Sequence, residues 1–165
     1  MKSKLMKMVG LCSVAFATVA MADVAQPAPA TPVTAVAAAA QNVTLLNGKV
    51  NPNAQVYFYL QSASWCVPCR MAMPGVVDAY KEMQQDGRAE VILVNYDRTP
   101  EEGKAYIQSY KTSMPTVHAK DPNLAKLPGF TRARGIPFVI VVDASGNVLA
   151  QGAPTRIQQW KTLVK

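Results

Sequence analysis

Three short runs of apolar residues constrain the fold more than any other feature of the sequence. Residues 55–60 (QVYFYL), 90–95 (EVILVN) and 138–142 (FVIVV) are almost continuously apolar. Such runs are typical of strands that are buried on both faces. Helical patterns separate them along the chain. The sequence therefore predicts an α/β domain in which helices cover both faces of a central mixed sheet.

Two helices are predicted between these strands. In the first, the apolar residues recur at helical spacing and Gly87 provides a stop signal. In the second, Thr99 is placed to act as N-cap, Pro100 suits the first helical position and Glu102 completes a capping box. We expect this second helix to end near Tyr110. The inward-facing residues of the first helix are Met73, Val76, Val77, Tyr80 and Met83.

The C-terminal third combines an irregular segment with a hairpin. Residues 111–135 contain three prolines and predict a long insertion, with one short helix near 123–127. Residues 143–147 (DASGN) are typical of a turn, so 148–151 should pair back as a strand. Thr155 is expected to cap a final helix. The resulting order is β-α-β-α-β-β-α.

The first 22 residues have the pattern of a secretory signal peptide. Three lysines precede an uncharged apolar run at 9–20, and Ala20-Met21-Ala22 forms a small-x-small cleavage site. An uncleaved membrane anchor is the alternative, but this run is short for a membrane-spanning helix. We expect residues 1–22 to be removed and the mature chain to begin at Asp23, in the periplasm.

The mature chain is predicted to contain a spacer and one domain. Residues 23–41 are rich in Ala and Pro and predict a flexible spacer, which leaves 42–165 as the folded domain. Removing residues 1–22 leaves 14 basic and 10 acidic residues, a net charge of +4, with no dense basic cluster. The sequence therefore argues against nucleic-acid binding. We expect a monomer.

The motif Trp65-Cys66-Val67-Pro68-Cys69 follows the first strand and opens the first helix. Free N–H groups and the helix dipole at this point favour a thiolate on the first cysteine. A structural zinc site needs four ligands, and only His118 is available to join the two cysteines. A structural disulfide would close a very small loop and stabilise little. A redox pair is the interpretation that remains, and no metal or other cofactor is expected.

The chain resembles the thioredoxin superfamily over about residues 55–164. Pro74 lies where thioredoxins have the proline of the active-site helix, and 95–100 (NYDRTP) resembles the N-x-D-x-x-P of that family. Residues 134–137 (RGIP) resemble the segment with its cis-proline. The resemblance implies a thioredoxin fold with an insertion before the cis-proline strand, and thiol–disulfide oxidoreductase activity.

The resemblance also implies which residues act. Cys66 and Cys69 would exchange a disulfide with substrate proteins, and Pro137 would be cis and pack against them. The Ile136 backbone would pair with an extended substrate segment. A reductase outside the cytoplasm would also need a membrane thiol shuttle as electron donor. The residues expected to contact substrate are Trp65, Val67, Pro68, Ile136 and Pro137.

Two departures from thioredoxin itself indicate a branch of the superfamily. Leu60 stands where thioredoxins have a buried aspartate, and the insertion before residue 134 is longer. Both resemble the tryparedoxin/nucleoredoxin branch or the exported reductases that serve cytochrome c maturation. Leucine cannot accept a proton, which leaves Asp97, Glu101 and Glu102 as candidates only because they are close in sequence. The favoured interpretation of all three is that they are solvated charges at the start of a helix.

Two other functions remain open from the residues alone. A metallochaperone would bind Cu(I) through the two cysteines and Met71 or Met73, because Cu(I) prefers soft ligands. A thioredoxin-fold binding module would have incidental cysteines. Arg132 and Arg134 either stabilise the Cys66 thiolate, bind an acidic partner, or are ordinary exposed loop charges. His118 is expected on the surface.

Overall fold

The computed structural model describes residues 33–165 of the chain. The predicted signal peptide, 1–22, and the start of the predicted spacer lie outside the described residues. Within the described range, no helix combines the length and the apolar character needed to cross a membrane.

A six-stranded mixed sheet forms the centre of the domain, with strand order β1-β4-β3-β2-β5-β6. Strands β2, β3 and β4 are parallel, whereas β5 pairs antiparallel with β2. The edge strands β1 and β6 are also antiparallel to their neighbours. This arrangement confirms the predicted mixed α/β sheet. The strands are β1 (Leu45–Asn47), β2 (Val56–Ser62), β3 (Ala89–Asn95), β4 (Thr116–His118), β5 (Phe138–Asp143) and β6 (Val148–Gly152).

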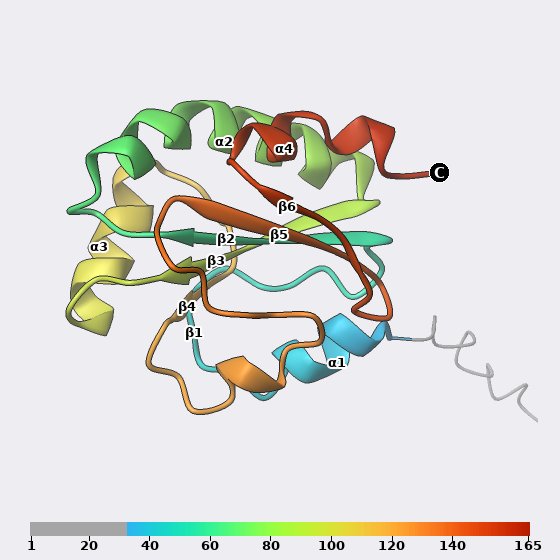
Figure 1. Cartoon of the computed structure of the whole chain (residues 1–165), viewed down its shortest axis with the longest axis horizontal. Coiled ribbons are helices and arrows are strands. Elements are labelled where there is room, and N and C mark those ends of the chain that lie inside the picture. The colour runs from blue at the N-terminus through green and yellow to red at the C-terminus, as the bar shows by residue number, and fades with distance from the viewer. Residues whose placement is uncertain (1–32) are drawn as a thin grey trace, which may run out of the picture.

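Helices cover both faces of this sheet. In Figure 1, α2 and α4 lie above the sheet and α1 lies below it. The predicted helix signals act as expected in two places: Gly87 ends α2 in a left-handed conformation, and the Thr99 side chain accepts a hydrogen bond from the Glu102 N–H. The helices are α1 (Ala35–Ala40), α2 (Val67–Asp86), α3 (Pro100–Ser109) and α4 (Thr155–Gln158), with 3₁₀ turns η1 (Leu124–Lys126) and η2 (Trp160–Thr162).

The structure corrects three predictions about these elements. Residues 35–40, assigned to the flexible spacer, form α1, and its Val36 is fully buried. The insertion at 111–135 contains strand β4, which pairs with both β3 and β1. Pro154, and not Thr155, occupies the N-cap position of α4, without a side-chain capping bond.

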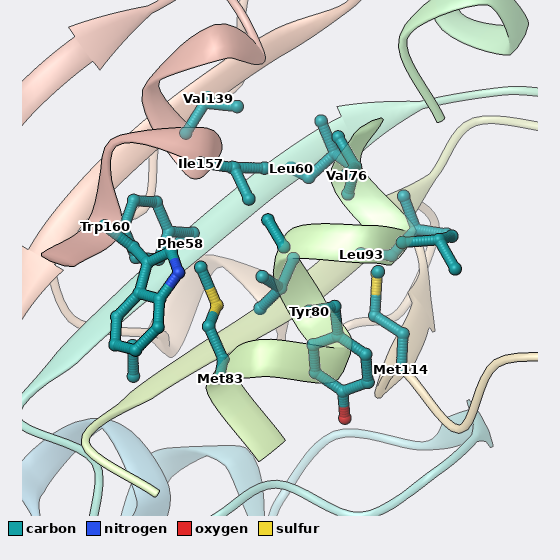
Figure 2. Packing of buried hydrophobic residues seen from close by; sticks show 14 of the residues in the cluster. Phe58, Leu60, Val76, Tyr80, Met83, Leu93, Met114, Val139, Ile157 and Trp160 are labelled. Atoms are coloured by element: carbon teal, nitrogen blue, oxygen red, sulfur yellow. The ribbon is translucent and has the colours of Figure 1, made fainter. Parts of the chain in front are cut away.

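Two apolar clusters hold the helices on the sheet. The larger cluster joins α2, α3 and the C-terminal segment to one face, and Figure 2 shows Phe58, Met83 and Trp160 packed within it. The second cluster joins α1 and the insertion to the other face, where Tyr57 and Tyr59 are fully buried. Burial of these large side chains supplies the main driving force for folding.

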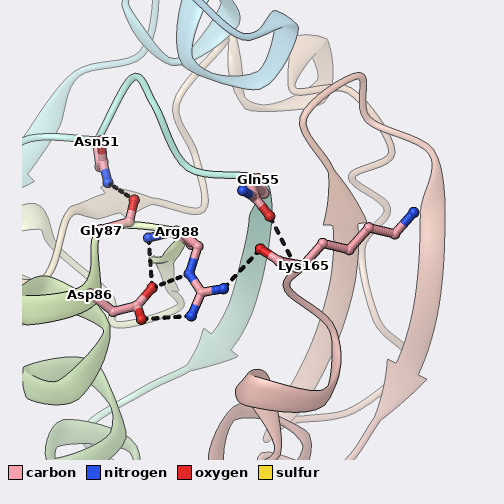
Figure 3. Close-up of polar contacts among 6 residues, drawn as sticks. All are labelled: Asn51, Gln55, Asp86, Gly87, Arg88 and Lys165. Atoms are coloured by element: carbon pink, nitrogen blue, oxygen red, sulfur yellow. Dashed lines mark hydrogen bonds and ion pairs between the residues drawn. The ribbon is translucent and has the colours of Figure 1, made fainter.

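Polar contacts fix the C-terminus beside the start of β2 and β3 (Figure 3). The Arg88 guanidinium makes two hydrogen bonds to the Asp86 carboxylate, of 2.7 and 2.8 Å, and donates a third to the Lys165 carbonyl at 2.8 Å. The Lys165 N–H donates to the Gln55 side chain at 3.2 Å. Asn51 donates to the Gly87 carbonyl. These contacts lie at the amino ends of the parallel strands β2 and β3. The CxxC motif follows the carboxyl end of β2, at the opposite end of the sheet.

The carboxyl ends of the parallel strands meet at that opposite edge. Ser62 pairs with Asn95, and Asn95 pairs with His118. The first residue of β5, Phe138, lies opposite Gln61. The CxxC motif, which follows Ser62, and Pro137, which precedes Phe138, are therefore gathered in one place. We call this edge, defined by Ser62, Asn95 and His118, the carboxyl edge.

Candidate active site

Cys66 and Cys69 form a disulfide at the start of α2, on the carboxyl edge. Cys66 is the N-cap residue with an extended backbone, and its Sγ accepts a hydrogen bond from the Cys69 N–H at 3.3 Å. The side-chain geometry thus directs a helix N–H at the sulfur that would carry negative charge after reduction. Cys66 is 6% exposed and Cys69 is 1% exposed, so Cys66 is the more accessible residue of the pair.

The segment before β5 lies against this disulfide. The Ile136–Pro137 peptide bond is cis, and the Ile136 carbonyl oxygen lies 3.7 Å from the Cys66 Sγ. Ile136 also packs against the small cluster of Ala63, Cys66 and Cys69. Ile136 and Pro137 are both half-buried. The backbone at this point is therefore placed next to the sulfur at which exchange would occur.

A buried carboxylate fixes the loop that leads into the CxxC motif. Asp97 is 3% exposed, and its Oδ1 accepts hydrogen bonds from the Ser64 N–H at 2.9 Å and the Ser64 hydroxyl at 2.7 Å. Its Oδ2 accepts from the Asn95 amide at 2.8 Å. The His118 Nε2 lies 3.0 Å from the Asp97 carbonyl oxygen. Ser64 precedes Cys66 by two residues, so this network sets where the first cysteine begins the helix.

A second buried network joins the insertion to the same site. Gln61, which is fully buried, donates to the Thr131 carbonyl at 2.9 Å and accepts from the Ala133 N–H at 2.9 Å. Its Oε1 also accepts from the Tyr96 hydroxyl at 2.7 Å. Tyr96 packs against the cysteine cluster, and its carbonyl accepts from the Trp65 indole at 3.3 Å. Sequence reasoning missed both residues. The one signal was a polar Gln at the end of an apolar strand.

Comparison with known proteins agrees with this geometry. A family model described as thioredoxin-like matches residues 53–148, which include the CxxC motif, the cis-proline and most of the sheet. The chain belongs to the thioredoxin-like family. The family and fold implied by the sequence landmarks are thereby confirmed.

Three known proteins illustrate the relationship. Nucleoredoxin from Mus musculus is 35% identical over 99 residues, which are 58% of this chain and 21% of the relative. The thiol-disulfide oxidoreductase ResA from Oceanobacillus iheyensis is 28% identical over 95 residues, 56% of this chain and 47% of the relative. This chain thus spans about a fifth of the nucleoredoxins that it matches. Tryparedoxin II from Crithidia fasciculata superimposes with a TM-score of 0.59 at 25% identity and covers 78% of this chain and 91% of its own.

The remaining residues predicted to contact substrate surround the disulfide of this thioredoxin-like domain. Trp65 is 63% exposed and Val67 is 54% exposed, and Pro68 is also exposed. A hollow of about 520 Å³ lies beside Trp65 and is lined by Ser64, Trp65, Tyr96, Arg98 and Glu102. The structure therefore brings the predicted cysteines, the Trp65–Pro68 segment and the Ile136–Pro137 segment together.

Of the three carboxylates that were candidates for the proton acceptor, two bond to residues other than Cys69. Asp97 is bonded to Ser64 and Asn95, as described above, and Glu102 accepts a hydrogen bond from the Arg98 N–H at 3.0 Å. Glu101 is exposed in the first turn of α3. Within residues 33–165, no hydrogen bond joins any of these carboxylates to Cys69. Asp97 is the one of the three that bonds to the loop leading into the CxxC motif, and it is buried rather than solvated.

His118, Met71 and Met73 were considered as possible metal ligands, and they differ from one another in burial. The expectation of a surface His118 was wrong: it is 7% exposed, and its Nδ1 accepts the Lys120 N–H. Met73 is fully buried in the larger core cluster, whereas Met71 is 78% exposed. Met71 is therefore the methionine that a Cu(I) site would have to use. Among the described residues, no group of three His, Cys, Asp or Glu side chains is arranged to hold a metal ion.

Proposed function

We propose that this protein is an exported thiol–disulfide oxidoreductase that reduces protein disulfides in the periplasm through Cys66 and Cys69. The observation that carries the proposal is the position of the disulfide. Cys66 caps α2, receives a helix N–H on its sulfur and lies beside the backbone of Ile136. The thioredoxin-like family and the similarity to a thiol-disulfide oxidoreductase support the same reaction class.

The reaction begins with the dithiol form of the protein. The Cys66 thiolate attacks one sulfur of a substrate disulfide; a bond forms between Cys66 and that sulfur, and the other substrate sulfur leaves as a thiolate. The Cys69 thiolate then attacks the Cys66 sulfur. This step forms the Cys66–Cys69 disulfide and releases the second substrate sulfur. Two electrons pass to the substrate, whose two thiolates take up the protons released from the enzyme's thiols.

The surroundings of the disulfide suit a protein substrate. An extended segment would place its backbone against Ile136, next to Pro137, and a neighbouring side chain would enter the hollow beside Trp65. Val67 and Pro68 would contact the same segment from the start of α2. A membrane thiol shuttle would return the protein to its dithiol form, because a reductase outside the cytoplasm needs electrons delivered across the membrane.

Reduction of insulin by dithiothreitol tests the proposed activity. We expect the protein to accelerate the reaction and Cys66→Ser to abolish the acceleration. Equilibration of the pair with glutathione or dithiothreitol then gives the direction. A reduction potential of the cysteine pair of about −270 mV, the thioredoxin value, supports a reductase. A value of about −120 mV indicates an oxidant. Absence of acceleration, together with tight Cu(I) binding in competition with a chelator, would replace this proposal with the metallochaperone.

A further inference from the structure

Arginines without acidic partners border the disulfide. Residues 63–77 carry Cys66 and the start of α2, and residues 122–142 carry Ile136 and Pro137; neither segment contains Asp or Glu. Both segments present exposed arginines to solvent. We call these arginines the arginine rim: Arg70, Arg132 and Arg134. Ion pairs in the described part of the chain occur elsewhere, at Lys81–Asp78, Arg88–Asp86 and Lys161–Glu82.

The rim residues come from separate segments, and each segment contacts Cys66 or the residues around it. Arg70 lies one helical turn after Cys66, and its N–H donates to the Cys66 carbonyl at 3.1 Å. Arg134 precedes by two residues the Ile136 carbonyl that lies 3.7 Å from the Cys66 sulfur. The Arg132 guanidinium donates to the Ala119 carbonyl. Thr131 and Ala133, on either side of Arg132 in sequence, bond to the same Gln61 side chain that accepts from the Tyr96 hydroxyl. The Arg132 charge opposes the rise that burial causes in the pKa of that hydroxyl.

The carboxylates at this edge lie on other segments than the rim. Asp121 follows His118 and accepts hydrogen bonds from the Thr44 and Asn123 N–H groups. The segment 96–102 contains Asp97, which is buried and bonded to Ser64, and Glu102, which lines the hollow together with Arg98. Glu101 is exposed beside Glu102. Arg98 partly balances these charges. The arginine rim therefore faces solvent without a compensating carboxylate on its own segments.

We infer that the carboxyl edge binds a protein segment that carries acidic residues next to its cysteines. The inference rests on the proposed function and specifies its substrate class. A protein segment fits better than an anionic membrane because the positive charge surrounds a disulfide, which must meet another sulfur. Exposed Val67 and Met71, on either side of Arg70, supply apolar contact for the same segment. Unpaired charges of this kind mainly raise the association rate and select the partner.

The test uses three synthetic peptide disulfides that differ only in the residues beside their cysteines: Glu, Ser or Lys. The dithiol form of the protein is mixed with each peptide, and the second-order exchange rate is measured at about 0.01 M and about 0.15 M ionic strength. We expect the Glu peptide to react about tenfold faster than the Lys peptide at low ionic strength. The ratio should fall with salt, because screening shortens the reach of exposed charges.

Charge-reversal variants locate the effect. Arg70→Glu combined with Arg134→Glu should invert the order of the peptides; neither side chain makes a hydrogen bond in the described structure. Lys49→Glu, an exposed lysine at the opposite end of the sheet, should leave the order unchanged. For each variant, the rate with the Glu peptide is divided by the rate with the Lys peptide. This ratio cancels any change that the substitutions cause in the reactivity of Cys66 itself.

The outcomes separate this inference from the proposed function. Failure with all three peptides and with the neutral hydroxyethyl disulfide would refute the proposed function. Equal rates with all three peptides would refute only the inference. The inference would also fail if Arg70→Glu/Arg134→Glu left the peptide ratio unchanged but abolished binding to phosphatidylglycerol vesicles. That result would make the rim a membrane contact.

Discussion

Gln61 connects two loops that are distant in sequence but adjacent at the active site. Its amide group bonds to Thr131 and Ala133, which lead into the cis-proline segment, and to Tyr96, which packs against the cysteines. All of these atoms are buried or partly buried. A substitution that removes the amide leaves backbone groups without partners, which costs more than a missing bond at the surface.

We predict that Gln61→Leu lowers the free energy of unfolding by about 2–4 kcal/mol, because two backbone groups and one hydroxyl lose their partner. Tyr96→Phe is the matched control. It removes one bond and leaves Gln61 bonded to both loop residues, so it should cost about 1 kcal/mol. Urea denaturation measures both values. Equal losses in the two variants would contradict the view that Gln61 holds the insertion in place.

Local and distant contacts explain which site residues were predictable. Cys66 and Cys69 are recognisable because their spacing and their position at the start of a helix depend only on neighbouring residues in the sequence. Gln61 bonds to residues 70 and 72 positions away, and His118 bonds to Asp97 21 positions away. No local pattern encodes these pairings. The burial of His118 and the role of Gln61 therefore emerged only from the fold.

Helix α1 shows how tertiary packing extends the domain beyond its predicted start. Thr34 caps the helix, and its hydroxyl also lies 2.6 Å from the Tyr57 hydroxyl of β2. Val36, Ala37 and Ala40 are buried against the sheet. The segment lacks large apolar residues, so its composition resembled a linker. Alanine favours helices, however, and small side chains allow a helix to approach a sheet closely. Strand β4 was not predicted for a related reason: it has only three residues, and they form a strand because they pair with β1 and β3.

A chain shortened to begin at Asn42 should be less stable than one that begins at Val33, by about 3 kcal/mol. The loss follows from the buried area of Val36, Ala37 and Ala40 and from the exposure of Tyr57 that would result. Thermal and urea unfolding of the two chains measure the difference. The disulfide should form in both, since α1 packs below the sheet and away from α2 (Figure 1). Equal stabilities would show that α1 is not part of the folded unit.

At the scale of the whole molecule, the two ends of the sheet carry different chemistry. The carboxyl edge holds the disulfide, whereas the opposite end buries the carboxyl group of Glu90. Its oxygens accept hydrogen bonds from the Asn51 and Val91 N–H groups, each at 2.8 Å. Burial nevertheless raises the pKa of Glu90 from 4.5 to about 7, and the hydrogen bonds offset only part of this rise.

This shift predicts a pH dependence of stability. Because the folded state binds the Glu90 proton more tightly than the unfolded state, stability falls as pH rises from about 4.5 to about 7. The loss from this group is on the order of 3 kcal/mol. The free energy of unfolding, measured by urea denaturation across this range, should decline in the wild type. The decline should be much smaller in Glu90→Gln, whatever its absolute stability. The same slope in both proteins would contradict the assignment.

The central claim is that Cys66 attacks substrate and Cys69 resolves the mixed disulfide. Its most direct test is to express Cys66→Ser and Cys69→Ser variants that retain residues 1–22, quench cells with acid and compare non-reducing gels. Cys66 is the more exposed residue of the pair and its sulfur receives the helix N–H, so Cys69→Ser should accumulate mixed disulfides with partner proteins. Cys66→Ser should accumulate few. Accumulation by Cys66→Ser alone would reverse the assignment, and accumulation by neither would contradict thiol–disulfide exchange as the function.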